Sequence, residues 1–242
     1  MKRADVLSVE KGVFPTRQKA IEAINSGFLT AGGKVVKKPS EKFDENVEFV
    51  FNGDTLKYVS RGGFKLEGAI KKFNLYFAGK VVLDMGASTG GFTDCALQNG
   101  AKLVYAVDVG SSQLASSLIS NPKVISMEKT DIRDVDKTIF DNCDVIVGDL
   151  SFISIIKILE AIKDKITNQQ IVLLIKPQFE CGMDVARQFK GRITSFKLSK
   201  EICDGVLDKI TKMGFVVKNL SESPIKGGDG NTEFICELKK EA

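Results

Sequence analysis

The sequence predicts a chain in two parts: a small α+β domain rich in positive charge, followed by an open α/β domain with a mostly parallel sheet. In the larger part, short apolar runs alternate with segments of helical periodicity, which is the pattern of a parallel sheet with helices on both faces. One run passes through a glycine loop into a helix, at Lys80–Asp94. The smaller part is predicted by a helix pair and a hairpin that carry many Lys and Arg residues.

The composition is that of an ordinary soluble globular protein, with 43% hydrophobic and 27% charged residues in 242. The longest aliphatic run, Ile171–Ile175, is far too short to span a membrane, and the charged N-terminus does not resemble a secretory signal. The five cysteines show no C-x-x-C pairing, which favours reduced thiols over disulfides or a zinc site. We therefore expect a cytoplasmic protein with no membrane segment and no bound metal.

The chain contains no histidine, which excludes Ser-His-Asp and Cys-His catalysis and any His-ligated metal. A general base would have to be Lys, Asp, Glu, Tyr or Cys. The net charge of +4 is unevenly spread, because Met1–Lys42 holds nine Lys or Arg against four Asp or Glu, a local balance of +5. This asymmetry favours an anionic partner that docks on the N-terminal part.

The N-terminal part is predicted to form two helices, Lys2–Glu10 and Arg17–Asn25, the second opened by Pro15 and Thr16. Phe28–Thr30 and Lys34–Val36 then form a hairpin about a Gly-Gly turn. Basic residues crowd one side of these elements, as phosphate contacts with RNA require. A solvated charged surface explains the same pattern equally well.

A polar linker, Asn52–Lys57, leads to a second glycine pair, Gly62-Gly63, which is predicted to form a turn. Apolar residues then recur at helical spacing from Phe64 to Phe73. Lys65 lies off this apolar stripe, so it points either into a cleft or into water, and taken alone water is favoured.

The glycine loop follows a predicted strand, Val81–Leu83, and precedes a predicted helix, Phe92–Leu97. Its spacing is G-x-x-x-G-G, whereas dinucleotide sites use G-x-G-x-x-G. Asp84 would repel phosphates but suits the ammonium or sulfonium of S-adenosylmethionine, and Asp108, at the end of the strand Leu103–Val107, suits a ribose. A purely structural turn between strand and helix is the alternative.

The alternation continues with a helix at Gln113–Ser120, a strand at Val124–Met127, a strand at Asp144–Val147, a helix at Ile153–Ile162 and a strand at Ile171–Ile175. Asp149 and Lys176 follow strands, where open parallel sheets bind ligands. Asp131 accepts from an adenine amino group or caps a helix, two roles that the sequence leaves equally open.

The last segment begins with a basic loop, Gly182–Ser195, which we expect to contact the substrate. A helix at Leu198–Met213 and two strands, Phe215–Leu220 and Glu233–Leu238, complete the chain. The two final strands are expected to place one antiparallel strand at the edge of the sheet.

Several motifs occur in an order that is specific to one group of proteins. Residues 58–236, with YVSRGGFKLE, DMGASTGGFTD, AVDVG, IKPQFE and SPIKGGDGNTEF, resemble ribose 2′-O-methyltransferases of the FtsJ/RrmJ type. Residues 2–50, with RADVL, TRQKA and GKVVKKP, resemble the RNA-binding module shared by a ribosomal small-subunit protein, bacterial tyrosyl-tRNA synthetases and many pseudouridine synthases. The whole chain is similar to the TlyA group, rRNA methyltransferases also labelled haemolysins.

The resemblance implies a Rossmann-like, doubly wound class I methyltransferase domain at 62–242, after an RNA-binding domain at 1–55 and a linker at 56–61. It implies methyl transfer from S-adenosylmethionine to a ribose 2′-hydroxyl of ribosomal RNA, at a cytidine, on a ribosomal subunit. The catalytic set maps onto Lys65, Asp149, Lys176 and Glu233. The expected cofactor residues are Asp84, Gly86, Ala87, Ser88, Thr89, Gly90, Gly91, Phe92, Asp108 and Asp131. The expected RNA-binding residues are Lys2, Arg3, Arg17, Lys19, Lys34, Lys37, Lys38, Arg61, Arg187, Lys190 and Arg192.

Physical reasoning assigns roles within the catalytic set. Lys176 is the candidate base or orienter of the hydroxyl, and Lys65 supplies a second cation. Asp149 positions Lys176 or the sulfonium, and Glu233 orients Lys65. Three other functions remain open: a non-catalytic RNA-binding or ribosome-assembly factor, a small-molecule methyltransferase, and a membrane-active haemolysin, for which the sequence offers no mechanism.

Overall fold

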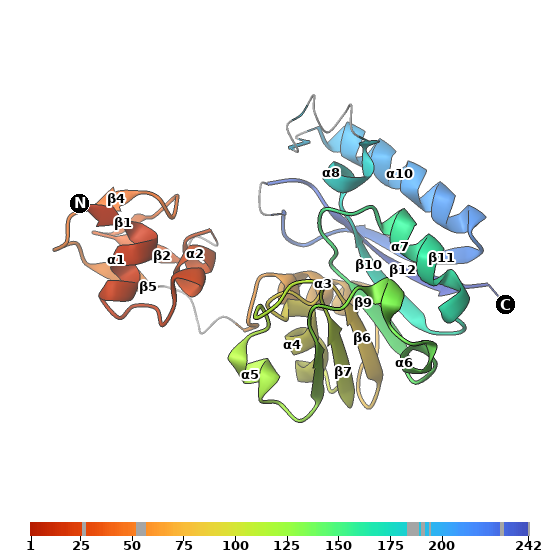
Figure 1. The fold of residues 1–242 in the computed structure, drawn as a ribbon. Helices are drawn as coiled ribbons and strands as arrows, with labels where there is room; N and C mark the ends of the chain where they lie inside the picture. Colours follow the sequence, from red (N-terminus) through yellow and green to blue (C-terminus); the bar gives the residue numbers. More distant parts are fainter. Residues whose placement is uncertain are drawn as a thin grey trace. The chain divides into compact units, whose positions relative to one another are not determined.

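The computed structural model describes residues 1–25, 28–51, 57–182, 189, 192, 193, 195–227 and 230–241. Contacts within the chain divide it into two compact units, Met1–Ser60 and Arg61–Ala242 (Figure 1). The expected domain boundary at residue 55 lies outside the described residues.

The N-terminal unit combines two helices with short antiparallel strands. Its elements are β1 (Lys2–Arg3), α1 (Ala4–Glu10), α2 (Arg17–Asn25), β2 (Leu29–Ala31), β3 (Lys34–Val35), β4 (Lys42–Phe43) and β5 (Phe49–Phe51). The first helix begins two residues later than the sequence predicts, because Lys2 and Arg3 pair with β4. The predicted hairpin is β2–β3, and β5 adds to the other side of β2.

The core of this unit lies between the helices and the three-stranded sheet. Leu7 of α1, Ile24 of α2 and Leu29 of β2 are almost completely buried there. Gly32 and Gly33, at the tip of the hairpin, both have positive φ values (54° and 79°). Residues with a Cβ rarely adopt such angles, so the glycine pair determines where the hairpin turns.

The C-terminal unit is built on a seven-stranded sheet in the order β11-β12-β10-β9-β6-β7-β8. The strands are β6 (Val81–Met85), β7 (Leu103–Val107), β8 (Val124–Met127), β9 (Val145–Gly148), β10 (Gln170–Ile175), β11 (Phe215–Glu222) and β12 (Phe234–Lys240). The pairs from β10 through β8 are parallel. The expectation of an antiparallel strand at the edge was wrong: β12 is the antiparallel strand and lies between β10 and β11.

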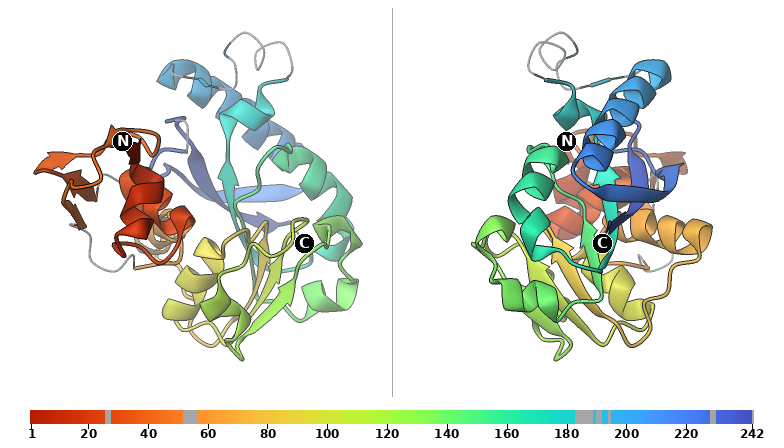
Figure 2. Two further views of the ribbon diagram at one scale, coloured as in Figure 1. Left: turned by 60° about the vertical axis from the view of Figure 1, so that its left-hand side comes forward. Right: turned by 90° about the vertical axis from the view of Figure 1, so that its right-hand side faces the viewer.

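Helices cover both faces of this sheet. They are α3 (Gly62–Phe73), α4 (Gly91–Gln98), α5 (Ser116–Ile119), α6 (Lys137–Asp141), α7 (Ile155–Ile162), α8 (Pro177–Glu180) and α10 (Phe196–Lys212), with short 3-10 turns η1 (Ile132–Asp134) and η2 (Lys163–Lys165). In the two views of Figure 2, α3 and α4 lie on one face, while α6, α7 and α10 lie on the other. Because alternate strand residues face opposite sides, Leu83 packs in the α7–α10 layer while Asp84 meets α4.

Two predicted local structures differ from the observed ones. Gly62 and Gly63 do not form a turn but begin α3. The helix predicted at Gln113–Ser120 is reduced to α5, because the backbone N–H groups of residues 112–114 bond to Glu128 instead of beginning a helix. No helix in the described part of the chain has both the length and the apolarity needed to cross a membrane.

Candidate active site

Four side chains from distant parts of the sequence meet at one edge of the C-terminal sheet. Lys65 comes from the first turn of α3, Asp149 and Lys176 follow β9 and β10, and Glu233 directly precedes β12. Neighbouring parallel strands end at the same edge, which brings Asp149 and Lys176 together. Since β12 runs antiparallel to β10, the start of β12 lies at that edge as well and places Glu233 there.

The four side chains form a continuous ion network. Lys176 Nζ lies 2.6 Å from Asp149 Oδ1, and Lys65 Nζ lies 3.1 Å from Asp149 Oδ2. Lys65 Nζ also lies 2.8 Å from Glu233 Oε2. Asp149 therefore bridges two ammonium groups, and two positive charges are balanced by two negative ones.

The network is shielded from water, which strengthens the interactions within it. Its side chains are between 3% and 19% exposed. Burial opposes the charge of Lys65, but Asp149 and Glu233 outweigh it and raise the pKa of this lysine. Burial likewise opposes the charge of Asp149, but Lys65 and Lys176 outweigh it and lower the pKa of that carboxyl. Both groups are therefore held in their charged forms. Lys65 is therefore buried, whereas its sequence position taken alone favoured a side chain that faces water.

Two further groups support the network, and the sequence did not single them out. Lys176 Nζ donates to Ser151 Oγ at 2.8 Å, and Gln178 Nε2 donates to Glu233 Oε1 at 3.1 Å. Gly227 passes so close to Glu233 that a Cβ there would lie 2.5 Å from Oε1. The absence of a side chain at Gly227 thus leaves room for the carboxylate.

A cavity of about 420 Å³ lies beside the network and shares Asp149 with it. Its size falls within the range of small-molecule sites. Its walls combine polar with apolar side chains, and they come from the ends of β6, β7, β8 and β9: Gly86, Ser88, Val107, Asp108, Val109, Gln113, Thr130, Asp131, Ile132, Asp149, Leu150, Ser151, Phe152, Ile153 and, from α7, Ile158.

The glycine loop adopts a backbone that most residues avoid. Gly86 and Gly90 have φ values of 78° and 94°, and Ser88 has 48°. A Cβ on Gly86 would lie 2.9 Å from the Leu150 side chain, and one on Gly90 would lie 2.2 Å from that of Leu118. The loop therefore depends on glycine for both conformation and space.

Asp108 holds the loop in place from the next strand. Its Oδ2 accepts from Ser88 N–H at 2.8 Å, and its Oδ1 accepts from Gly110 N–H at 2.7 Å. The carboxylate also lines the cavity, so the residue predicted to meet a ribose is available at its wall.

Asp84 is completely buried, and Thr93 Oγ1 donates to its Oδ2 at 2.6 Å. Its Oδ1 has no hydrogen-bond partner among the described residues. Burial raises the pKa of this carboxyl to about 7, and the nearby Asp149 adds to the effect. Asp84 is not among the described residues that line the cavity. A carboxyl oxygen without a partner is expensive to bury, which marks Asp84 as a group suited to a further donor or cation.

The other expected cofactor residues divide into two sets. Gly86, Ser88, Asp108 and Asp131 line the cavity. Ala87, Thr89, Gly90, Gly91 and Phe92 form the loop and the start of α4 behind it, and are not among the described lining residues.

Asp131 plays the capping role that the sequence left open. It accepts from Arg133 N–H at 2.9 Å at the start of η1, and Arg133 Nη2 lies 2.6 Å from its Oδ2. Arg133 lowers the pKa of this carboxyl to about 2. Because Asp131 also lines the cavity, the capping role does not exclude contact with a ligand.

The expected RNA-binding residues differ in how they are held. Arg3 and Arg17 each donate to the buried Asp5 at 2.9 Å, and these contacts, led by the one from Arg3, lower the pKa of Asp5. Lys2 pairs with Glu10. Arg61 donates to the carbonyl of Lys226. The remaining described ones are exposed, namely Lys19, Lys34, Lys37, Lys38 and Arg192, while Arg187 and Lys190 lie outside the described residues.

The described residues contain no cluster of three or more His, Cys, Asp or Glu side chains arranged to hold a metal ion. All five cysteines are free thiols, and burial raises the pKa of Cys143 and Cys203 to about 12.

Comparison with known proteins gives consistent results over most of the chain. Residues 58–240 match the family described as FtsJ-like methyltransferase. Hemolysin A of Brachyspira hyodysenteriae is 41% identical, covering 98% of this chain and 99% of that protein. The 16S/23S rRNA (cytidine-2′-O)-methyltransferase TlyA of Mycobacterium tuberculosis is 35% identical, covering 98% of this chain and 89% of that protein.

A solved structure of a candidate hemolysin from Streptococcus thermophilus has the same fold, with a TM-score of 0.76 and 41% identity. The match covers 99% of this chain and 88% of that one. The matched family spans the glycine loop, the cavity and all four residues of the ion network. The chain belongs to the FtsJ-like methyltransferase family.

Proposed function

We propose that this protein transfers a methyl group from S-adenosylmethionine to a ribose 2′-hydroxyl of ribosomal RNA, at a cytidine, in the cytoplasm. The observation that carries the proposal is the position of Asp149. This carboxylate belongs both to the buried Lys65–Lys176–Glu233 network and to the wall of the cavity. A cofactor in the cavity would therefore lie beside the charged groups that handle the acceptor.

The residues of the cavity suit S-adenosylmethionine. Asp108 is placed to accept from ribose hydroxyls, and Val109 and Ile132 offer apolar surface for a purine. Asp84 does not line the cavity but lies two residues before Gly86, which does, and its unpaired Oδ1 would accept from the cationic end of the amino acid part if that end reaches behind the glycine loop. S-adenosylmethionine supplies an electrophilic methyl group on a sulfonium.

The network suits the activation of a sugar hydroxyl, which is a weak nucleophile while it keeps its proton. As an ammonium, Lys176 would donate to the hydroxyl oxygen and fix its position; as a free amine, it would accept the proton. In the salt bridge with Asp149, 2.6 Å away, Lys176 would orient the hydroxyl. For methyl transfer it would release a proton to solvent and, as the free amine, take up the hydroxyl proton while the oxygen–methyl bond forms and the methyl–sulfur bond breaks. Glu233 and Asp149 together hold Lys65 as a second cation, which would favour loss of the hydroxyl proton by stabilising negative charge on the oxygen.

The N-terminal unit is proposed to bind the RNA. The exposed Lys34, Lys37 and Lys38 follow one another on the β2–β3 hairpin and the segment after it. Asp5 anchors Arg3 and Arg17, whose side chains remain 44% and 57% exposed. Cations held at fixed positions make better phosphate contacts than freely moving ones. The TlyA relative, which is named for ribosomal RNA, shares nearly the full length of this chain, including this unit.

Incubation with methyl-labelled S-adenosylmethionine and purified ribosomal subunits tests the proposal. The wild type should label RNA, and Lys176→Ala should lower the rate at least a hundredfold. Lys137→Ala is the matched control, because it removes an exposed lysine paired with Asp141 away from the site. Unlabelled RNA with the wild type, or equal rates for wild type and Lys176→Ala, would contradict the proposal.

The same assay separates two other functions. A non-catalytic RNA-binding or assembly factor would bind subunits without labelling them. A membrane-active haemolysin would release dye from lipid vesicles, an activity that we do not expect, because no described helix is suited to crossing a membrane.

A further inference from the structure

The loop between β7 and α5 forms one wall of the cavity although it has little structure of its own. Val109 and Gln113 line the cavity, and the segment between them is Gly110-Ser111-Ser112. Ser112 has a positive φ of 56°. Short polar residues and a glycine fix a backbone poorly, so something outside the loop must hold it.

Glu128, the residue directly after β8, provides this support. Its Oε2 accepts from Ser112 N–H at 2.8 Å, and its Oε1 accepts from Gln113 N–H at 2.8 Å and Leu114 N–H at 3.2 Å. Three successive backbone amides thus converge on one carboxylate, an arrangement that usually binds an anion. The three bonds, led by the one from Ser112, lower the pKa of Glu128, so the group is charged at neutral pH.

The amides that Glu128 holds belong to residues that contact the rest of the pocket. The Gln113 side chain packs against Gly110 and accepts from Ser88 Oγ at 3.2 Å. The Leu114 side chain packs against Gly90, where a Cβ would lie only 2.8 Å from it. A shift of this loop would therefore disturb both the wall of the cavity and the glycine loop across from it.

We propose that Glu128 is a positioning residue that keeps the 109–114 loop in its binding conformation and so sets the affinity for S-adenosylmethionine. The inference rests on the proposed function, because it takes this cofactor as the occupant of the cavity. Glu128 itself does not line the cavity among the described residues, so it acts through the loop and not by touching the ligand.

The expected effect follows from the fraction of molecules with a formed loop. Without the carboxylate, the three backbone N–H groups would hydrogen-bond to water and the loop would sample other conformations. If one molecule in ten keeps the binding conformation, the apparent Kd rises about tenfold. Glu128→Gln should produce this change, since a carboxamide carries no charge and its NH2 group faces amides that need an acceptor.

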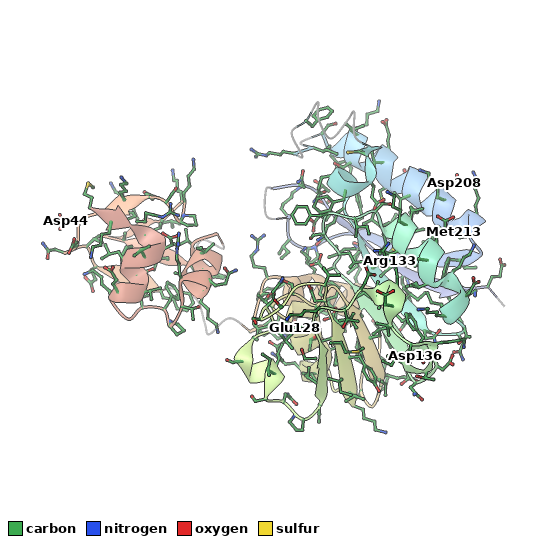
Figure 3. All side chains as sticks on the ribbon, viewed as in Figure 1. Asp44, Glu128, Arg133, Asp136, Asp208 and Met213 are labelled. Atoms are coloured by element: carbon green, nitrogen blue, oxygen red, sulfur yellow. The ribbon has the colours of Figure 1, made fainter. Side chains whose placement is uncertain are left out.

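Two measurements on the full chain test the proposal: calorimetric titration with S-adenosylmethionine and hydrogen exchange of the amides at 112–114. We expect Glu128→Gln to raise the Kd about tenfold and to speed the exchange of these amides, with Glu128→Ala at least as strong. Asp136→Ala is the matched control. Asp136 also accepts a hydrogen bond from a backbone N–H group, that of Thr138 at 2.8 Å, but it does so at the start of α6. Figure 3 shows Glu128 and Asp136 well apart.

A Kd for Glu128→Gln within twofold of the wild type would overturn the inference, even if the variant unfolds at a lower temperature. So would unchanged exchange at 112–114, because the loop would then not depend on Glu128. If the wild type fails to bind S-adenosylmethionine at all, the proposed function falls as well, and the two failures are thereby distinguished.

Discussion

The Asp149–Lys176 contact can be measured directly with a double-mutant cycle of Asp149→Asn and Lys176→Met. The two charged atoms lie 2.6 Å apart, and the side chains are 19% and 8% exposed. At an effective dielectric constant of about 20, two unit charges at this distance attract by roughly 6 kcal/mol. Desolvation of both ions costs several kcal/mol each, which offsets most of the attraction.

We expect Asp149→Asn to lower the free energy of unfolding by about 3 kcal/mol, because it removes the carboxylate that Lys176 contacts among the described residues and leaves Lys65 with Glu233. Lys176→Met should cost about 2 kcal/mol, since Asp149 keeps Lys65 as a partner. The double variant should be about 2 kcal/mol more stable than the sum of the single effects, because the second substitution removes an ion that already lacks its partner.

Urea unfolding of the four proteins at pH 7.5 gives the coupling energy. The pKa of Asp149 is lowered in the folded state, so its contribution is present above the unfolded pKa of about 3.9 and disappears as the pH falls through the folded value. The pKa of Lys65 is raised, so its contribution is present below about 10.4. Both contributions are therefore complete at pH 7.5.

A matched cycle on the exposed Lys137–Asp141 pair should give at most about 0.5 kcal/mol. A coupling below about 0.5 kcal/mol for Asp149 and Lys176 as well would refute the reasoning, because it would mean that the buried contact does not form in solution.

Three other predictions follow from the site and the basic surface. The folded pKa of Asp84, about 7, is above the ordinary value, so the folded protein is most stable where this carboxyl is neutral, at low pH. From about pH 4 to pH 7 the free energy of unfolding of the wild type should fall by up to about 1.4 kcal/mol per pH unit relative to that of Asp84→Asn, as measured by urea unfolding. Gly86→Ala should destabilise the protein by about 1–3 kcal/mol and weaken binding of S-adenosylmethionine in calorimetry, since its Cβ meets a leucine side chain at 2.9 Å; unchanged binding would contradict this account. Replacing Lys34, Lys37 and Lys38 with Gln should reduce the slope of log K against log salt for RNA by about 2, as measured by filter binding, and an unchanged slope would remove these lysines from the interface.

The sequence predicted the sheet and its ligand edge because both depend on local patterns. Strand residues such as Val82 and Leu83 form apolar runs, and the glycine loop after β6 has a spacing that can be recognised without a structure. The ends of β9 and β10 then locate Asp149 and Lys176, because parallel strands end at a common edge.

The remaining features depend on contacts between residues that are distant in the sequence. Nothing near Lys65 indicates that it is buried, since both of its carboxylate partners belong to other elements. The place of β12 inside the sheet could not be predicted from its composition, because β11 and β12 are both plausible edge strands. The role of Glu128 could not be predicted, because the three amides that bond to it lie 14 to 16 residues earlier, in a segment whose sequence largely predicts a helix.

The chemical position of the methyl group tests the central claim most directly. RNA labelled by the wild type can be hydrolysed with alkali, which cleaves each linkage that has a free 2′-hydroxyl. The proposed reaction predicts that the label is recovered in alkali-resistant dinucleotides that begin with 2′-O-methylcytidine, and that Lys176→Ala yields almost none of them. Label recovered in mononucleotides with a methylated base would contradict the account.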